Sequence, residues 1–221
     1  MTSYDTMIHD GIEVSIILAT YNRASYLHRC IDSVMEQSFT NWELVVIDDG
    51  STDDTFGIVN AYVERDSRVK YGKHSHRGVV QSKNAGMQAS SGRYITFIDS
   101  DDTFEKDHIQ TRLDYMHRHP VLDIIEGGVE MTEEIYMIDY FNRGRLIHIR
   151  ECVLGATFFG KRHIFFALKG FQDTEYAYGE DTDFWMRAEQ RFHTQKIDQP
   201  RTYWYTRAED SITKTANHTS V

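Results

Sequence analysis

The apolar positions in the first half of the chain follow two alternating patterns. Short runs rich in Val, Ile, Leu, Phe and Trp are followed by longer stretches in which apolar residues recur every three or four positions. The short runs are typical of buried strands and the longer stretches of amphipathic helices. Four strands with three helical crossovers predict an α/β fold with a doubly wound, mostly parallel, Rossmann-like sheet. The strands are expected at residues 13–19, 42–47, 69–73 and 93–98, and the helices at about 24–37, 51–64 and 79–89.

The second half of the chain has a less regular pattern. Helices are expected at about 105–118, 162–168 and 181–191. Apolar stretches at 121–130, 135–150 and 153–159 predict shorter strands, which we expect to form a smaller, irregular sheet. Because no repeat or low-complexity linker interrupts the chain, we expect one domain over residues 1–221. Its nucleotide-type half is expected at about 13–102, its substrate-type half at about 103–213, and a tail at 214–221.

Composition narrows the class of protein. A net charge of −10 without a Lys/Arg stripe argues against nucleic acid as a partner. Cys30 and Cys152 are too few and too far apart for a disulfide framework or a zinc site. The N-terminus has no secretory signal pattern, and the longest apolar run, 14–19, is too short to span a bilayer. We therefore expect a cytoplasmic protein without a transmembrane segment, which leaves peripheral membrane association open.

An acidic triplet follows the fourth expected strand. Alternate residues of an extended chain point the same way, so Asp99 and Asp101 are expected to direct their carboxylates into one space, with Ser100 between them. Two ionised carboxylates so close repel each other unless one is protonated or a cation neutralises both, which favours a hard divalent ion. The carboxyl ends of parallel strands are also where α/β proteins bind ligands. The alternative is an acidic turn with a helix N-cap.

The loops after the first two strands carry further candidate groups. After the first strand, Thr20, Tyr21 and Arg23 could hold a nucleobase by stacking and a phosphate by charge. The alternative is a loop in which Asn22 or Ser25 caps the next helix. After the second strand, Asp49 could accept a hydrogen bond from a pyrimidine imide N–H, or it could simply form the turn before Gly50.

Two more patterns concern helix starts. Ser51 and Asp54 have the spacing of a capping box for the helix that follows them. The segment Gly179-Glu180-Asp181 opens the last expected helix. Carboxylates in a first helical turn favour the helix dipole, but one placed opposite a leaving group could also be the general base for a hydroxyl nucleophile.

Taken together, five segments resemble the family 2 glycosyltransferases with the GT-A fold, and the resemblance runs from about Val14 to Thr213. They are residues 14–23 (VSIILATYNR), 46–53 (VIDDGSTD), 82–86 (SKNAG), 92–102 (GRYITFIDSDD) and 179–187 (GEDTDFWMR). The resemblance implies that a nucleotide-sugar donor, with uridine as the expected nucleoside, is bound through Mg²⁺ or Mn²⁺. It assigns Thr20, Tyr21, Asp49 and Lys83 to nucleotide binding, Asp99 and Asp101 to the metal and diphosphate, and Asp181 to the role of general base. We place Arg23 and Ser100 with the donor-binding residues.

The implied activity is inverting transfer of a sugar to an acceptor hydroxyl in the synthesis of a bacterial-type polysaccharide or glycoconjugate. A sugar nucleotidyltransferase and a non-catalytic nucleotide-sugar-binding module are the alternatives. Many relatives carry a C-terminal His-X-X-Ser-X-Ser/Thr element whose histidine approaches the metal or diphosphate. Here Ser211 and Thr213 fit that element but Ala208 stands in place of the histidine, so Arg207 could be a substitute cation or the tail could simply pack, and no metal role is assigned to it. The acceptor is expected to be a glycan or glycoconjugate shaped by residues 121–152.

Overall fold

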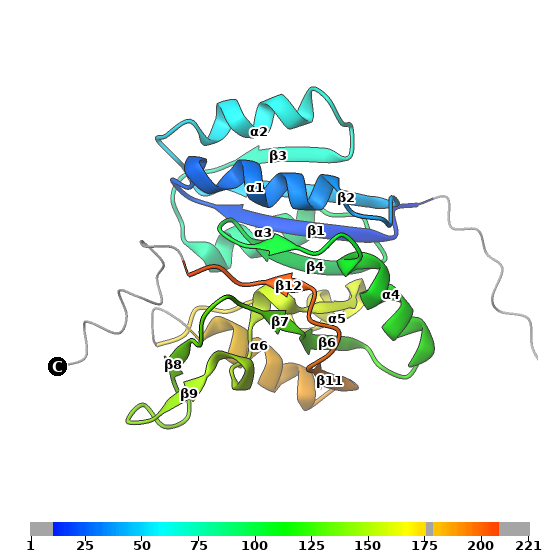
Figure 1. Ribbon diagram of the computed structural model, residues 1–221, viewed down its shortest axis with the longest axis vertical. Coiled ribbons are helices and arrows are strands. Elements are labelled where there is room, and N and C mark those ends of the chain that lie inside the picture. Colours follow the sequence, from blue (N-terminus) through cyan, green and yellow to red (C-terminus); the bar gives the residue numbers. More distant parts are fainter. Residues whose placement is uncertain (1–10, 176–178, 208–221) are drawn as a thin grey trace, which may run out of the picture.

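The computed structural model describes residues 11–175 and 179–207, and its centre is a seven-stranded sheet (Figure 1). The strand order is β11-β6-β10-β4-β1-β2-β3. Within the described part of this sheet, β10 runs antiparallel to both of its neighbours and the other pairings are parallel. The expected mostly parallel, doubly wound sheet is therefore confirmed. Its strands are β1 (Val14–Thr20), β2 (Trp42–Asp48), β3 (Val69–Lys73), β4 (Tyr94–Asp99), β6 (Ile124–Gly127), β10 (Phe159–Lys161) and β11 (Thr194–Ile197).

Helices cover both faces of the sheet and bury alternate strand residues (Figure 1). On β1, Ile16 and Leu18 belong to one apolar cluster and Ile17 to the other, as the side-chain alternation of a strand requires. Both faces are covered, which explains why β1 and β2 appear in the sequence as nearly continuous apolar runs. The helices are α1 (Ala24–Met35), α2 (Thr55–Val63), α3 (Val79–Ala89), α4 (His108–Arg118), α5 (Arg162–Ala167) and α6 (Glu180–Glu189).

The register of the central strands aligns their carboxyl ends. Thr20 of β1 pairs with Asp48 of β2, and Ala19 pairs with Asp99 of β4. The loops that carry the candidate residues of the first half therefore start at one level, along one edge of the sheet. This edge is where an open parallel sheet binds ligands.

Two smaller sheets lie beside this edge. One has the order β5-β12-β7 and the other is the β8–β9 hairpin, in agreement with the expected irregular second sheet. The hairpin projects from the lower left of the molecule in Figure 1. The remaining elements are β5 (Thr103–Phe104), β7 (Val129–Glu130), β8 (Tyr136–Ile138), β9 (Leu146–His148), β12 (Tyr203–Trp204) and the 3-10 turns η1 (Ile149–Glu151) and η2 (Gly155–Thr157).

The prediction of a strand at residues 153–159 is wrong. This apolar run forms η2, and β10 begins only at Phe159. The hydroxyl of Thr157 donates to the carbonyl of Leu154 and accepts from the amide of Gly127, while the Gly155 amide donates to Asp181. These side-chain hydrogen bonds replace the backbone ladder that a strand would make.

The strand expected at 121–130 is also shorter and divided. Gly127 and Gly128 have φ values of 97° and 66°, which turn the chain between β6 and β7. Within the described residues no helix is long and apolar enough to cross a membrane.

Candidate active site

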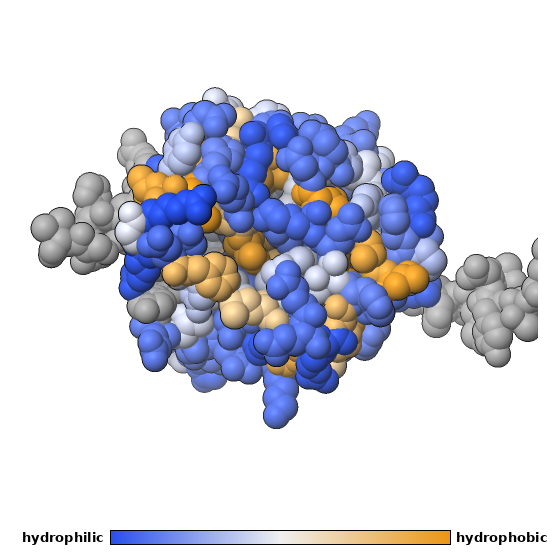
Figure 2. All heavy atoms as spheres, turned by 90° about the horizontal axis from the view of Figure 1, so that it is seen from below, coloured by the Kyte–Doolittle hydropathy of each residue, from blue (hydrophilic) through white to orange (hydrophobic). Residues whose placement is uncertain are grey.

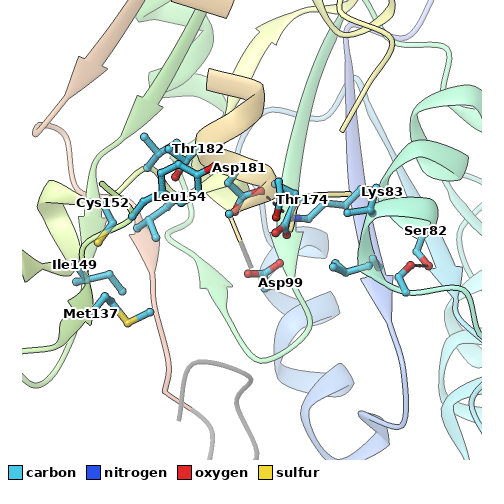
Figure 3. Close-up of a pocket in the computed structure, with 18 of the residues that line it drawn as sticks. Ser82, Lys83, Asp99, Met137, Ile149, Cys152, Leu154, Thr174, Asp181 and Thr182 are labelled. Carbon is cyan, nitrogen blue, oxygen red and sulfur yellow. Dashed lines mark hydrogen bonds and ion pairs between the residues drawn. The ribbon is translucent and has the colours of Figure 1, made fainter. Parts of the chain in front are cut away.

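One cavity lies at the carboxyl edge of the sheet, and all nine of the predicted site residues line it. Its volume is about 720 Å³, within the usual range for a ligand pocket. It is bounded by the loops after β1, β2 and β4, the start of α3, the β8–β9 hairpin and the first turn of α6. The close-up in Figure 3 shows Asp99, Lys83 and Asp181 near its middle. The predicted residues brought together are Thr20, Tyr21, Arg23, Asp49, Lys83, Asp99, Ser100, Asp101 and Asp181.

Lys83 connects the two sides of the cavity. Its Nζ lies 3.0 Å from Oδ1 of Asp181 and 3.3 Å from Oε1 of Glu180, although almost 100 residues separate α3 from α6. Its ammonium group also lies 5.0 Å from the ring centre of Phe171. Burial alone would lower the pKa of Lys83, but the two carboxylates outweigh it and raise the pKa, so the side chain stays charged. The sequence assigned Lys83 to the nucleotide; its contact with the predicted base is visible only in the structure.

Asp181 is held in one orientation by two donors. Lys83 binds Oδ1, and the amide of Gly155 donates to Oδ2 over 2.9 Å. A Cβ at position 155 would overlap this carboxylate, so a glycine is needed for the amide to approach it. Each carboxylate oxygen has a second lone pair, which leaves Asp181 able to accept a proton from a ligand in the cavity.

Asp99 and Asp101 lie beside this group and make the centre of the cavity acidic. Burial raises the pKa of Asp99 to about 7, and the charges of Asp101, Asp181 and Glu180 act in the same direction against Lys83. Asp181, Glu180 and Asp99 thus act on the ammonium group of Lys83, and Asp101 adds a fourth carboxylate beside Asp99. This excess of negative charge would be relieved by a bound cation.

Asp102, directly after the triplet, has a structural role. Its Oδ2 accepts a hydrogen bond of 2.6 Å from the hydroxyl of Tyr203, and its Oδ1 accepts one of 2.6 Å from the amide of Thr206. The same tyrosine hydroxyl accepts from the amide of Asp99 over 3.2 Å. Strand β12 therefore fixes the loop that carries the acidic triplet. Sequence reasoning missed Tyr203, because a two-residue strand gives no periodic signal.

The loop after β1 is tied to the loop after β2. Asn22 has a φ of 51°; its amide donates to Ser51 Oγ over 2.9 Å, and its Oδ1 accepts from the amide of Thr52 over 2.8 Å. The start of α1 is instead capped by Asp53, which accepts from the amide of Ala24. Neither alternative for a cap, Asn22 or Ser25, makes a side-chain cap bond on α1.

The expected capping box of α2 is not formed either. That helix begins at Thr55, with Asp54 in the N-cap position and no side-chain cap bond. Asp53 instead accepts from the Thr55 amide and hydroxyl, at 3.2 and 2.7 Å. The hydrogen bond of Ser51 to the β1 loop explains the difference, because its hydroxyl is directed away from the helix.

Tyr21 and Thr20 offer different contacts to a ligand. The ring of Tyr21 stacks on His76 with the centres 4.1 Å apart and remains 41% exposed. The buried hydroxyl of Thr20 has no hydrogen-bond partner in the described part of the chain. A buried hydroxyl without a partner costs about 1–3 kcal/mol, which a bound ligand would recover.

Asp49 already has several partners. Its Oδ1 accepts from the amide of Arg77 over 2.7 Å, and its Oδ2 accepts from the amide of Gly78 over 2.9 Å. The imidazole nitrogens of His76 and His74 lie 2.7 and 3.3 Å from the same carboxylate. Asp49 thus orders the loop before α3 as well as lining the cavity. No local sequence pattern predicts this contact, because only the fold brings both histidines to Asp49.

The residues at the end of β4 fit a divalent metal that also binds a ligand. Within the described residues, no group of three or more His, Cys, Asp or Glu side chains could hold a metal by itself. Mg²⁺ is usually held by one or two carboxylates together with substrate phosphates. Asp99 and Asp101 match that donor set in an acidic cavity. Ala208, Ser211 and Thr213 of the C-terminal element lie outside the described residues.

The family model named Glycosyl transferase family 2 matches residues 15–166, more than half of the chain. The chain belongs to this family. The match supports the resemblance that the five segments indicated and runs through the first four of them. Segment 179–187, which carries Asp181, lies beyond it.

Curated relatives in the family share part of the chain. An uncharacterised glycosyltransferase of Haemophilus influenzae is 40% identical over 104 residues, which cover 47% of this chain and 42% of the relative. The putative teichuronic acid biosynthesis glycosyltransferase TuaG of Bacillus subtilis is 35% identical over 129 residues, 58% of this chain and 51% of TuaG. The matched part is thus about half of each relative's length or less.

Solved structures have the same fold. TarS of S. aureus in complex with UDP-GlcNAc superposes with a TM-score of 0.76 at 21% identity, over 92% of this chain and 61% of TarS. The mannosyltransferase PcManGT of Pyrobaculum calidifontis, in complex with GDP-Man and Mn²⁺, gives a TM-score of 0.71 at 19% identity, over 90% and 58%. The GT-A-type fold expected for this family is therefore confirmed.

Proposed function

We propose that this protein transfers a sugar from a nucleotide-diphosphate donor, with UDP as the expected nucleotide, to an acceptor hydroxyl. The observation that carries the proposal is the contact of Lys83 with Asp181 inside the cavity that Asp99 and Asp101 also line. This contact brings Asp181, the predicted general base, to the part of the cavity where Asp99 and Asp101 are predicted to bind the diphosphate. The complexes of TarS with UDP-GlcNAc and of PcManGT with GDP-Man support a nucleotide-sugar donor. The name of TuaG supports a place in bacterial polysaccharide or glycoconjugate synthesis.

Asp181 is the proposed general base. It accepts the proton of the acceptor hydroxyl as that oxygen forms a bond to the anomeric carbon of the donor. The bond from the anomeric carbon to the diphosphate oxygen breaks, and its electron pair leaves with the diphosphate. Lys83 and the Gly155 amide hold the carboxylate in place during this step.

Asp101 and Asp99 are the proposed metal-binding residues, with Asp101 as the direct ligand and Asp99 closer to the ribose or sugar. Mg²⁺ or Mn²⁺ bound there would neutralise charge on the diphosphate. Thr20, Tyr21, Arg23 and Asp49 are proposed to border the nucleotide, and Ser100 the donor. The unpartnered Thr20 hydroxyl supports this side of the cavity as the nucleotide site.

A donor-hydrolysis screen tests the proposal. The protein is incubated with UDP-, GDP- and dTDP-sugars, each with Mg²⁺, with Mn²⁺ and with EDTA, and release of the nucleoside diphosphate is measured. We expect release from at least one UDP-sugar, with either metal but not with EDTA. Pyrophosphate release from an NTP and a sugar phosphate would instead favour the nucleotidyltransferase alternative. Binding of UDP without hydrolysis or transfer with any donor would favour a non-catalytic module.

The expected preference for uracil as the nucleobase gives a first prediction. Asp49 can accept from uracil N3–H, which cytosine lacks, so UDP is expected to bind more tightly than CDP when metal is present. Each oxygen of Asp49 already accepts from a backbone amide, so N3–H would add one more hydrogen bond to a charged acceptor, worth about 1.5–3 kcal/mol or roughly a factor of 10 to 150 in affinity. Asp49→Ala should narrow the ratio of the two dissociation constants, measured by titration calorimetry, and Asp54→Ala, on the exposed start of α2, should not.

The informative quantity is the ratio of the dissociation constants of CDP and UDP, and not either constant alone. Asp49 also holds the amides of Arg77 and Gly78, so its removal is expected to weaken both nucleotides. Equal affinities of UDP and CDP for the unmutated protein would show that Asp49 does not recognise the base.

The stereochemistry gives a second prediction. One displacement by an acceptor held on the Asp181 side should invert the anomeric centre, so that an α-linked donor gives a β-linked product. The anomeric proton coupling in the NMR spectrum of a gluco- or galacto-type product distinguishes the α from the β configuration. A retained configuration would rule out the single displacement.

A further inference from the structure

The cavity has two chemically different halves on either side of Asp181 (Figure 3). Ser82, Lys83 and Asp99 lie on one side, together with the polar loops after β1 and β2. On the other side lies a surface that we call the apolar wall. It consists of Met137, Ile147, Cys152, Val153 and Leu154 from the β8–β9 hairpin and the segment after it, with the fully buried Ile149 behind them.

The apolar wall offers few groups that could bind sugar hydroxyls. Four of its five side chains are aliphatic or thioether, and the fifth is a thiol. The Cys152 thiol donates weakly to the carbonyl of His148, and burial raises its pKa to about 11, so it is uncharged at neutral pH. Sugar hydroxyls buried there without partners would be unfavourable.

The carboxylates next to the apolar wall form hydrogen bonds and ion pairs within the β8–β9 hairpin and the 3-10 turn after it. Asp139 accepts from the amide of Phe141 over 2.9 Å. Glu151 accepts from the amide of His148 over 3.3 Å and lies 3.8 Å from Arg145. Asp139 and Glu151 also line the cavity, but these interactions engage their carboxylates within the segment, and the five wall side chains between them are apolar or a neutral thiol.

The apolar character continues from the cavity to the surface. On the same hairpin and its turn, Tyr136, Leu146 and Phe141 are 50%, 61% and 72% exposed. Figure 2 looks onto the lower face of the molecule, where apolar patches interrupt a mostly polar surface. Phe141 also lines the cavity and therefore joins it to the exposed surface, whereas strand alternation puts Tyr136 and Leu146 on the opposite face of the hairpin from Met137 and Ile147.

We infer that the acceptor carries a hydrocarbon group close to its reactive hydroxyl and that the apolar wall binds this group. The inference rests on the proposed function, because Asp181 places the acceptor hydroxyl between the two halves. With the donor on the polar side, the acceptor is left with the apolar side. The exposed Phe141, which also lines the cavity, extends this surface for a hydrocarbon chain longer than the cavity. An amphipathic acceptor, such as a lipid-linked one, fits both features.

The test compares two probes with the same head group. Methyl and octyl β-D-glucoside, both below the micelle concentration, compete with the apolar dye anilinonaphthalene sulfonate for the protein, and dye fluorescence is measured. Burial of one methylene is worth at most about a fourfold gain in affinity. We expect octyl glucoside to displace the dye at concentrations at least about tenfold lower than methyl glucoside. Equal potency of the two glucosides, or no displacement by either, would overturn the inference.

Two variants locate the binding. Met137→Ser and Ile147→Ser, at half-buried positions, are expected to weaken octyl glucoside binding several-fold. Phe56→Ser removes an exposed apolar side chain on α2, away from the cavity, and should leave it unchanged. Unchanged binding in both wall variants would place the hydrocarbon elsewhere and contradict the inference. If a wall variant does not fold, the chain-length comparison on the unmutated protein still decides.

Two further measurements separate the possible failures. Donor hydrolysis by water needs no acceptor, so hydrolysis without any octyl preference would leave the proposed function standing and remove this inference. Absence of both nucleotide binding and hydrolysis would remove the proposed function itself. Sedimentation velocity with and without octyl glucoside tests a second copy of the chain as occupant. A dimer that the glucoside dissociates would identify the wall as a contact between copies and overturn the inference.

Discussion

Asp181→Asn is expected to lower the rate of sugar transfer by about 10²–10⁴-fold or more and to leave UDP binding nearly unchanged, because it removes only the general base. The asparagine keeps the size of the side chain, and its carbonyl oxygen can still accept from Lys83 or from Gly155. Lys83 also keeps Glu180 as a charged partner at 3.3 Å, so its buried ammonium group is not left alone. The variant is therefore expected to fold.

A transfer assay together with titration calorimetry of UDP distinguishes the possible roles of Asp181. Asp183→Asn is a matched control, because Asp183 lies on the same helical turn but pairs with Arg187 at 2.7 Å. It should retain transfer. If UDP affinity falls in Asp181→Asn as far as the rate does, Asp181 is a structural residue.

Asp101→Ala is expected to abolish both the metal-dependent part of nucleotide-diphosphate binding and turnover. The carboxylate lies at a strand end outside the apolar core, so its loss should not unfold the protein. The backbone carbonyl of Asp101, which accepts from Arg29, remains in the variant. Calorimetric titrations of UDP with Mg²⁺, with Mn²⁺ and with EDTA should give three different affinities for the unmutated protein and one common affinity for the variant.

The exposed Asp107 provides the control for that experiment. Asp107→Ala removes the same charge a few residues further along the chain, and we expect it to retain the metal effect. Full activity of Asp101→Ala would remove the metal assignment, whereas unfolding, checked by circular dichroism, would assign the residue to stability.

The elements that could be predicted from the sequence are those whose pattern is imposed by local burial. Strands β1, β2 and β4 are covered on both faces, so their residues form continuous apolar runs bounded by polar loops. Strand β12 has two residues, and β11 alternates few apolar residues with polar ones, so neither stands out. The run at 153–159 is as apolar as a strand, but the hydrogen bonds of Thr157 and Gly155 to distant residues turn it into η2.

In the candidate site too, local sequence patterns predicted some features, whereas others depend on contacts between distant segments. The residues at the end of β4 predicted that Asp99 and Asp101 share one space, because strand direction fixes where such loops gather, whereas the role of Asp181 was implied only by the family resemblance. The partners of those residues were not predictable. Lys83 reaches Asp181 from another helix, and His76 stacks on Tyr21 from another loop, and such pairs depend on distances that no local pattern encodes.

The attachment of Tyr203 to Asp102 limits how the C-terminal part of this chain can be shortened or fused. Residues 203–206 belong to the support of the acidic loop, since the Tyr203 hydroxyl and the Thr206 amide both bind Asp102. A truncation that ends before Tyr203 would keep Asp99, Asp101 and Asp181 and still lose the geometry of the acidic loop. A reporter or affinity tag therefore belongs after Thr206, and a fragment screen for the smallest active piece should keep at least the residues up to this position.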